Sequence, residues 1–326
     1  MPKRLSATEY ENGVRSGNRY LLSKAITLVE SRRPSDQQLA QTVLTNLMPQ
    51  TGNALRLGIT GVPGVGKSTF IEHFGHMVAD TGRKVAVLAI DPSSPTSKGS
   101  ILGDKTRMNT LAQHENAFIR PSATGNSLGG VGQKTRETML LCEAAGYEVI
   151  IVETVGVGQS ETVVRGMVDF FLLLMLPGAG DELQGIKRGI MEMADAIAIN
   201  KADSNNQKRA RRAQQAYQNA LHLFPPHPSG WVPPVLTCSA LLKDKLDTVW
   251  ETVQKFATHT QTNGFWAQQR QAQNRDWFYE AIRQELEQRF FHDPEVREQL
   301  THFERAVASG EQPPRAAALA LLEAAG

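Results

Sequence analysis

The stretch Gly61-Val62-Pro63-Gly64-Val65-Gly66-Lys67-Ser68 follows an apolar segment, residues 55–60, and fits the pattern G-x-x-x-x-G-K-[ST]. Glycines at these positions let successive backbone N–H groups turn inward around a phosphate without a Cβ clash. Lys67 would reach the β- and γ-phosphate oxygens, and the Ser68 hydroxyl would face Mg²⁺. A helix beginning at Thr69 would present its N-terminus to the same anion. The pattern predicts a nucleoside-phosphate site; the alternative is a glycine-rich turn that holds no ligand.

The composition is that of an ordinary folded protein. Of the 326 residues, 40% are apolar and 21% are charged, so disorder is not indicated. This length suffices for one large core and a smaller appended unit. The net charge of +2 argues against a nucleic-acid partner, because such a protein must neutralise many phosphates.

Location is predicted from what the sequence does not contain. Met1-Pro2-Lys3-Arg4 is positively charged, but no apolar segment of a secretory signal follows it. The longest apolar run, residues 170–176, is too short to cross a membrane. Cys142 and Cys238 are far apart and lack metal-ligand spacing, which is typical of buried thiols in a reducing compartment. We therefore expect a cytoplasmic protein with no membrane partner.

The chain divides into three segments by pattern. Residues 1–52 have apolar residues at helical spacing and capping-box patterns at Ser6 and Ser35, which predicts an N-terminal helical arm. Residues 53–262 alternate apolar strands with amphipathic helices, which predicts a P-loop domain with a mostly parallel sheet flanked by helices. Residues 263–326 show only helical stripes. Their apolar surface is either docked on the main domain or shared between two subunits, and we favour a homodimer.

Seven strands and several helices are predicted in the central segment. The strands are residues 55–60, 84–90, 117–120, 149–154, 170–176, 196–200 and 235–238. Helices are predicted at residues 133–145, 186–193, 206–223 and 246–258. In such a sheet, the ligand-binding loops lie at the carboxyl ends of the strands.

The nucleotide base is predicted from Asn200-Lys201-Ala202-Asp203, which follows a strand and has the form N-K-x-D. The Asp203 carboxylate can accept from both the N1–H and the exocyclic amine of guanine, whereas adenine offers no such pair on that edge. The Lys201 stem can lie along the base plane. Ser239-Ala240-Leu241 follows the last strand, and its backbone N–H would bind guanine O6. The alternative for Asp203 is a helix N-cap; the position after a P-loop predicts GTP and GDP instead.

Magnesium prefers oxygen ligands and requires more of them than Ser68. Three acids are candidates: Asp91 after the second strand, Asp104, and Glu153 at the end of the fourth strand. Asp91 begins a loop rich in proline, serine and glycine, a composition typical of a switch segment. The alternative for Asp104 is a surface acid beside Lys105.

Catalytic candidates are Lys67, Glu153, Gln159 and Lys187. Glu153-Thr154-Val155-Gly156 has the form of a strand end running into a glycine whose N–H would sense the γ-phosphate. Gln159 would orient the attacking water, with a polar loop residue of no special role as the equal alternative. A second glycine-rich loop, residues 178–189, contains Lys187 and Arg188, which would offset transition-state charge. The favoured alternative is that this loop contacts a partner protein.

Four longer motifs make the chain similar to a known family. They are Asp91-Pro92-Ser93-Ser94-Pro95, Gly99-Ser100-Ile101-Leu102-Gly103-Asp104-Lys105-Thr106-Arg107-Met108, Glu153-Thr154-Val155-Gly156-Val157-Gly158-Gln159-Ser160-Glu161 and the loop 180–189. Over nearly its whole length the chain resembles the MeaB/ArgK family of P-loop GTPases, which belongs to the SIMIBI class and is associated with methylmalonyl-CoA mutase.

This resemblance implies a GTPase that acts as a chaperone. It would bind the adenosylcobalamin-dependent mutase, gate cofactor loading and protect the mutase from inactivation. It also implies a homodimer through the C-terminal helices, and a third switch at residues 180–189. By motif match, Asp91, Asp104 and Glu153 would be linked to Mg²⁺, and Lys187 to hydrolysis. The chain departs from the family pattern at Lys98, where a glycine is expected, and at residues 122–126.

Two other functions compete with this one. A nucleotide-dependent kinase of an arginine/ornithine-type transport system would need a second acceptor site, which the sequence does not indicate, and N-K-x-D disfavours ATP. A metal-inserting GTPase would use histidine-rich tracts or paired cysteines. The eight histidines and two cysteines here are scattered.

Overall fold

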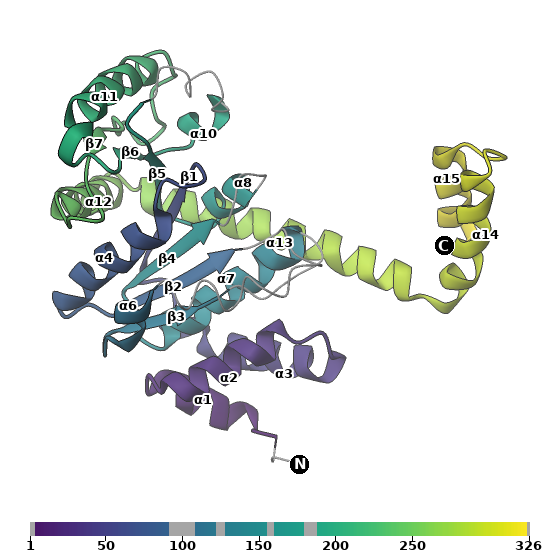
Figure 1. Cartoon of the computed structure of the whole chain (residues 1–326). Helices are drawn as coiled ribbons and strands as arrows, with labels where there is room; N and C mark the ends of the chain where they lie inside the picture. Colours follow the sequence, from purple (N-terminus) through teal and green to yellow (C-terminus); the bar gives the residue numbers. More distant parts are fainter. Residues whose placement is uncertain (1–3, 91–107, 122–127, 155–159, 179–187, 325–326) are drawn as a thin grey trace. The chain divides into compact units, whose positions relative to one another are not determined.

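In the computed structural model, the described residues are 4–90, 108–121, 128–154, 160–178 and 188–324. Among them, one parallel sheet has the strand order β3-β2-β4-β1-β5-β6-β7 (Figure 1). The strands are β1 (Leu55–Gly61), β2 (Val85–Ile90), β3 (Ala117–Arg120), β4 (Val149–Thr154), β5 (Phe170–Met175), β6 (Ala196–Ile199) and β7 (Val235–Thr237). The predicted parallel sheet is confirmed.

The central strands β4 and β5 are buried along their whole length and are apolar apart from Glu153 and Thr154 at the end of β4. β4 and β5 read Val-Ile-Ile-Val-Glu-Thr and Phe-Phe-Leu-Leu-Leu-Met, and each of their residues is buried. Continuous apolar runs of this kind are expected where helices cover both faces of a sheet. β1 lies between them, with Gly58 opposite Phe171. A Cβ at Gly58 would lie 2.8 Å from the Phe171 ring, so the packing there requires glycine.

Helices cover both faces of the sheet. The helices α4 (Lys67–Asp80), α6 (Asn109–Gln113) and α12 (Leu246–Thr262) contribute to one apolar core, around Leu57 and Ile59. The residues of β5 and β6 that belong to a second apolar core, such as Leu173 and Ile197, pack against α10 (Arg188–Glu192) and α11 (Gln207–Leu221). The helix α8 (Ser160–Arg165) brings Val164 against Gly58 of β1.

An N-terminal arm of α1 (Ala7–Arg15), α2 (Arg19–Glu30) and α3 (Pro34–Leu47), followed by η1 (Met48–Gln50), packs against α7 (Leu128–Ala144). The capping box predicted at Ser6 is confirmed: its hydroxyl accepts from the Glu9 N–H, and the Glu9 carboxylate accepts from the Ser6 N–H. The one predicted at Ser35 is wrong. Pro34 already has the fixed φ of a first helical residue, so α3 begins before Ser35 and its N-cap is Arg33.

Two buried ion pairs lie before the amino ends of β5 and β6. Arg270 donates to both carboxylate oxygens of Asp169, at 2.7 Å each, and also to the Ala54 carbonyl at 2.5 Å. Arg165 of α8 donates to Asp195 at 2.6 Å. Both carboxylates are at most 2% exposed. Arg165 belongs to α8 and Arg270 to α13 (Phe265–His292), so the two pairs attach these helices to the sheet.

His227 lies against the second pair, with Nε2 3.4 Å from Asp195 Oδ1. Burial raises the pKa of Asp195 to about 6, although Arg165 opposes the shift. Burial, together with the charge of Arg165, lowers the pKa of His227 to about 4. At neutral pH the histidine is therefore uncharged.

The chain divides into two compact units, Met1–Gln273 and Asn274–Gly326, and the boundary falls inside α13 (Phe265–His292). The second unit continues with α14 (Pro294–Ala308) and α15 (Pro314–Ala324). The helix start predicted at Asp293-Pro294 is confirmed, because the Asp293 carboxylate accepts from the N–H groups of Glu295 and Val296. None of the helices in the described residues has the length and apolar character needed to cross a membrane.

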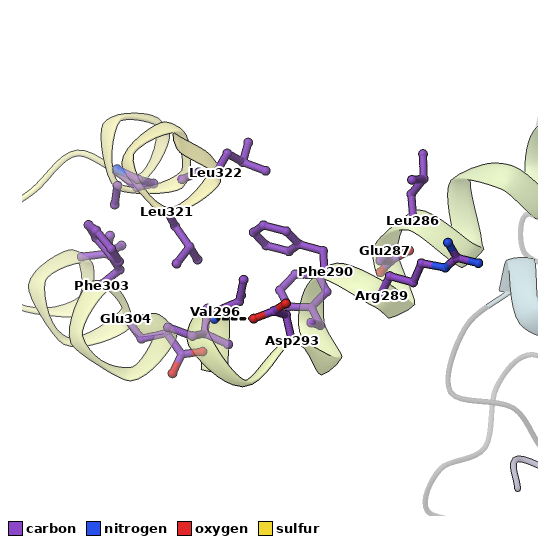
Figure 2. A pocket seen from close by; sticks show the side chains of 16 residues that line it. Leu286, Glu287, Arg289, Phe290, Asp293, Val296, Phe303, Glu304, Leu321 and Leu322 are labelled. Atoms are coloured by element: carbon purple, nitrogen blue, oxygen red, sulfur yellow. Dashed lines mark hydrogen bonds between the residues drawn. The ribbon is translucent and has the colours of Figure 1, made fainter. Parts of the chain in front are cut away.

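The second unit contains a groove of about 860 Å³. Its lining is mainly apolar and includes Leu286, Phe290, Val296, Phe303, Leu321 and Leu322. Figure 2 shows Phe290 and Leu321 pointing toward one another across the groove. Leu322 is 53% exposed, and no residue of α13 is fully buried. The helices of this unit therefore leave much of their apolar surface uncovered.

Candidate nucleotide site

The loop between β1 and α4 has the backbone that its glycines predict. Gly64 and Gly66 have φ values of 77° and 90°, in the left-handed region that favours glycine. A Cβ at Gly61 would lie 2.5 Å from the Leu174 carbonyl oxygen, so this residue must also lack a side chain. α4 begins at Lys67, two residues earlier than predicted, because Gly66 itself serves as the N-cap. Its N-terminus therefore faces the loop.

Side chains of the loop are divided between core and surface. Val65 is fully buried, whereas Pro63, Gly64 and Thr69 are exposed. The Lys67 ammonium donates to the Gly61 carbonyl at 2.7 Å and so lies within the loop. Burial lowers its pKa, and the charges of Glu153 and Glu161 oppose that shift.

Ser68 and Glu153 lie close together at the ends of α4 and β4. Their side-chain oxygens are 3.5 Å apart, and Glu153 is 4% exposed. The parallel pairing of Ile59 with Glu153 explains this placement, because the end of β4 lies beside the start of the loop. A hydroxyl and a carboxylate are ligands of the kind that Mg²⁺ prefers, so this pair fits the predicted metal. Asp91 and Asp104, the other predicted ligands, lie outside the described residues.

The N-K-x-D segment is bonded to the phosphate loop. The Asn200 amide donates to the Val65 carbonyl at 2.8 Å, and its oxygen accepts from the Ala240 N–H at 2.9 Å. The Lys201 ammonium donates to the Gly64 carbonyl at 2.8 Å. The buried Asn200 side chain thus joins the phosphate loop to the segment Ser239-Ala240-Leu241.

The Asp203 side chain does not cap a helix. It precedes η2 (Ser204–Asn206), but its side chain makes no capping hydrogen bond there. Instead its carboxylate accepts from the Ser239 hydroxyl, which itself accepts from the Leu242 N–H at 3.2 Å. Asp203 thus stands at the N-cap position of η2, as in the alternative, but its carboxylate is bonded to Ser239 and not to the helix N-terminus. Leu241, whose backbone N–H is the predicted contact with the base, has a side chain that is 71% exposed.

Sequence analysis missed two contacts at this edge. His73 of α4 contacts the Ala240 carbonyl at 2.6 Å. Thr154 donates to the Thr60 hydroxyl at 2.8 Å, which joins the ends of β4 and β1. Neither contact has a sequence signature, because each joins residues that only the fold brings together. Gln159 and Lys187, the remaining catalytic candidates, lie outside the described residues.

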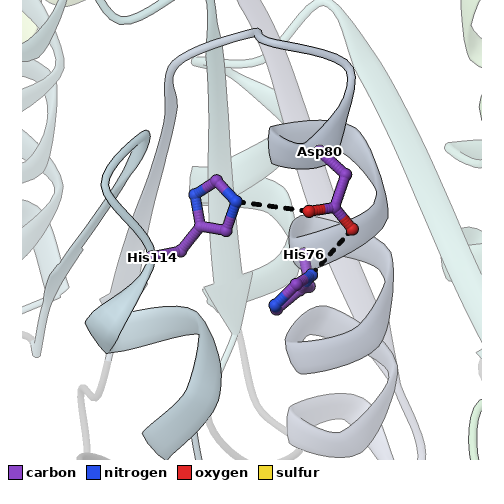
Figure 3. Close-up of side chains that lie close together, drawn as sticks. All are labelled: His76, Asp80 and His114. Carbon is purple, nitrogen blue, oxygen red and sulfur yellow. Dashed lines mark hydrogen bonds and ion pairs between the residues drawn. The ribbon is translucent and has the colours of Figure 1, made fainter.

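A second cluster of polar side chains lies away from the loop (Figure 3). Asp80 is 2.9 Å from His76 Nδ1 and 3.3 Å from His114 Nε2, the spacing of a candidate metal site. However, the Asn116 N–H donates to His114 Nδ1 at 3.0 Å, so the ring proton is on Nε2 and donates to Asp80. A metal ion would have to break this arrangement. The cluster is a hydrogen-bonded link between α4 and His114, the residue that follows α6.

Comparison with known proteins identifies the family. The family model described as "Methylmalonyl Co-A mutase-associated GTPase MeaB" matches residues 22–295. The Escherichia coli protein named GTPase ArgK is 53% identical over 273 residues, which cover 84% of this chain and 82% of that protein. The Mus musculus protein named methylmalonic aciduria type A homolog, mitochondrial, is 45% identical over 322 residues, 96% of this chain and 78% of that protein.

A solved structure is also similar to this chain. It is described as a LAO/AO transport system kinase, is 41% identical, and covers 99% of this chain and 98% of its own, with a TM-score of 0.76.

Proposed function

Because the chain belongs to the MeaB family of GTPases, we propose that its hydrolysis of GTP serves an adenosylcobalamin-dependent methylmalonyl-CoA mutase. In this proposal the GTPase is a chaperone: it binds the mutase, controls cofactor loading and protects the mutase from inactivation. The observation that carries the proposal is the family match over residues 22–295, whose description names this mutase. The name of the mouse relative, which refers to methylmalonic aciduria, supports it.

We infer the following roles at the nucleotide site. The backbone N–H groups of Gly61 to Ser68, except at Pro63, which has none, surround the phosphates, with Thr69 completing the first turn of α4. The Lys67 ammonium exchanges the Gly61 carbonyl for a phosphate oxygen. Asp203, held by Ser239, accepts from guanine, and Lys201 covers the base. Hydrogen bonds from Asn200 and Lys201 to the phosphate loop support this assignment, because they join the two segments that we propose to bind the base and the phosphates.

Mg²⁺ fits this site through Ser68 and Glu153, with Asp91 and Asp104 as further proposed ligands. When bound, the ion neutralises charge on the phosphate oxygens. In the same proposal, Gln159 orients the attacking water and Lys187 offsets the charge that develops during hydrolysis. These last two roles rest on the sequence motifs alone.

We propose that the protein works as a homodimer in the cytoplasm. The occupant of the groove in the second unit would be the same unit of a second copy, so that the exposed apolar side chains Leu286 and Leu322 become covered. A two-fold interface of this kind is self-complementary. The unit is small, and units of this size seldom bury enough apolar surface without a partner.

The test is GTP hydrolysis by the full chain, with and without a purified methylmalonyl-CoA mutase, and with ATP as the control nucleotide. We expect hydrolysis of GTP only, faster in the presence of the mutase, and abolished in both cases by Lys67→Ala. Equal GTP turnover with and without the mutase would contradict the proposed client. Preference for ATP would contradict the assignment of the guanine site.

The structural relative described as a transport system kinase suggests the alternative function. If the chain were such a kinase, incubation with labelled ATP and an arginine- or ornithine-binding protein would yield a stable phosphoprotein. We expect none, because Asp203 has no pair of donors to accept from on adenine.

A further inference from the structure

His73 lies on α4, six residues after Lys67, and contacts the segment that follows β7. Its Nδ1 is 2.6 Å from the Ala240 carbonyl oxygen. A carbonyl oxygen only accepts hydrogen bonds, so His73 Nδ1 carries a proton and donates it. The Lys243 N–H approaches the same oxygen from within the loop at 3.3 Å, a longer and weaker contact. His73 is therefore the stronger donor to this carbonyl, and it comes from the helix that follows the phosphate loop.

This hydrogen bond also determines where the Leu241 N–H points. The Ala240 carbonyl and the Leu241 N–H belong to one peptide group, and no peptide bond among the described residues is cis. In a planar trans peptide the C=O and the N–H point in opposite directions. A donor on α4 that holds the carbonyl therefore directs the Leu241 N–H away from α4.

The other two N–H groups of Ser239-Ala240-Leu241 already have partners. The Ser239 N–H donates to the Asp244 carbonyl at 3.1 Å, and the Ala240 N–H donates to the Asn200 side chain at 2.9 Å. Among the described residues, the Leu241 N–H has neither a backbone carbonyl nor a side-chain oxygen as its acceptor. It is the donor of this segment that remains for a ligand.

We propose that His73 is a positioning residue for guanine: by holding the Ala240 carbonyl, it orients the Leu241 N–H toward guanine O6. This inference rests on the proposed guanine site and names a residue that determines its specificity. Its consequence is that α4, which holds the phosphates at its N-terminus, also positions one of the groups that recognise the base. Loss of the His73 hydrogen bond then weakens recognition at position 6 of the purine and leaves the Asp203 contacts in place.

The experiment measures binding of GDP and of 6-thio-GDP to the full-length protein. The thio analogue keeps the N1–H and the exocyclic amine that Asp203 recognises, but its sulfur is a poorer acceptor than O6. His73→Ala is expected to weaken GDP binding by about three- to tenfold, the effect of one net hydrogen bond. Binding of 6-thio-GDP is expected to change by less than about twofold, since most of that bond is already lost.

Two further variants make the result specific. His73→Asn places an amide N–H near the position of Nδ1, and it is expected to restore most of the GDP affinity. His76→Ala removes a histidine from the same helix that contacts Asp80 instead, and it is expected to leave both affinities unchanged.

Three outcomes would overturn the proposal: unchanged GDP binding by His73→Ala, an equal loss for GDP and 6-thio-GDP, or an equal loss for His76→Ala. If His73→Ala weakened the binding of GDP and 6-thio-GDP equally, His73 would only support the fold. If the unmodified protein does not prefer GDP to ADP, the guanine site itself is wrong, and this result is distinct from the other three.

Discussion

At the scale of single residues, Asp203 shows how a carboxylate is held ready for a ligand. Its nearest partner is the Ser239 hydroxyl, which is buried and also bonded to the Leu242 N–H. The serine therefore cannot turn away without losing a second hydrogen bond. A carboxylate in this position keeps acceptor capacity for two donors on one edge of a purine, and this capacity underlies the choice of guanine.

The substitution Asp203→Asn is expected to change the preferred base. An asparagine amide offers a donor where the carboxylate offers only acceptors, so it suits the 2-carbonyl of xanthine and not the 2-amine of guanine. We expect GTP affinity to fall by about a hundredfold or more and xanthosine triphosphate to become the better substrate. Hydrolysis assays with both nucleotides would measure this, and an unchanged preference for GTP would place the base elsewhere.

The pair of Asp195 and His227 predicts a pH dependence of stability with opposing contributions. Between pH 6.5 and 4 the unfolded chain protonates His227 and the folded chain does not, so its contribution to the free energy of unfolding falls as the pH falls. Asp195 acts in the opposite sense between pH 6 and 3.8, because the folded chain binds that proton first.

His227→Asn removes only the first contribution. The variant is expected to be less sensitive to acid than the unmodified chain, so the difference in unfolding free energy between them should shrink from pH 7 to pH 4.5. Urea unfolding at a series of pH values would measure it. A difference that stays constant over this range would show that His227 does not resist protonation in the folded chain.

At the scale of elements, the sheet could be predicted from the sequence almost residue by residue. β3 and β4 have the predicted bounds, and the other strands differ from prediction by one residue at an end. Prediction succeeds here because strands covered on both faces are continuous apolar runs. At helix starts several local signals compete, and at α3 the proline in position 34 determined the start instead of the predicted serine.

The candidate site divides in the same way. Its loop, Lys67, Ser68 and the N-K-x-D segment have fixed spacing, so the sequence predicts them. The contact of His73 with Ala240 joins positions 167 residues apart. Outside the site, the ion pair of Asp195 with Arg165 likewise joins two separate elements. A single sequence contains no signal for such pairs, because they depend on how helices and strands pack.

The first part of α13 is attached through the buried Arg270 pair as well as through Gln269 and Gln273, which donate to the Val168 carbonyl. Arg270→Met would leave Asp169 buried with only the Arg56 N–H, at 2.8 Å, among its present donors. We expect a loss of about 3–5 kcal/mol in the free energy of unfolding, measured by urea and circular dichroism. The exposed Arg275, on the same helix, is the matched control: Arg275→Met should change stability by less than about 0.5 kcal/mol.

A second variant tests the reason for this loss. If the unpaired carboxylate causes it, adding Asp169→Leu to Arg270→Met should recover part of the stability. No recovery would mean that the lost bonds from Arg270 to backbone carbonyls, and its contact with the Trp266 ring at 4.6 Å, matter more than the charge.

At the scale of the whole molecule, the proposed homodimer predicts a difference between two neighbouring leucines of α15. Leu322 lines the groove and is 53% exposed, whereas Leu319 is 51% exposed and does not line it. Leu322→Asp is expected to give a monomer in analytical ultracentrifugation, because an uncompensated charge would be buried in the interface. Leu319→Asp should remain a dimer. A dimeric Leu322→Asp protein, or two monomers, would contradict the groove as the interface.

The hydrogen bonds from Asn200 and Lys201 to the phosphate loop have a consequence that coordination chemists would recognise as a chelate effect. The donors for the two ends of a nucleotide belong to one rigid multidentate receptor, so the freedom of an intact nucleotide is lost once for both sets of contacts. Guanosine or pyrophosphate alone would lose the same freedom on binding but would make only about half of the contacts that compensate for it. Free fragments of the nucleotide should therefore be poor competitors, and only the intact molecule should occupy the site.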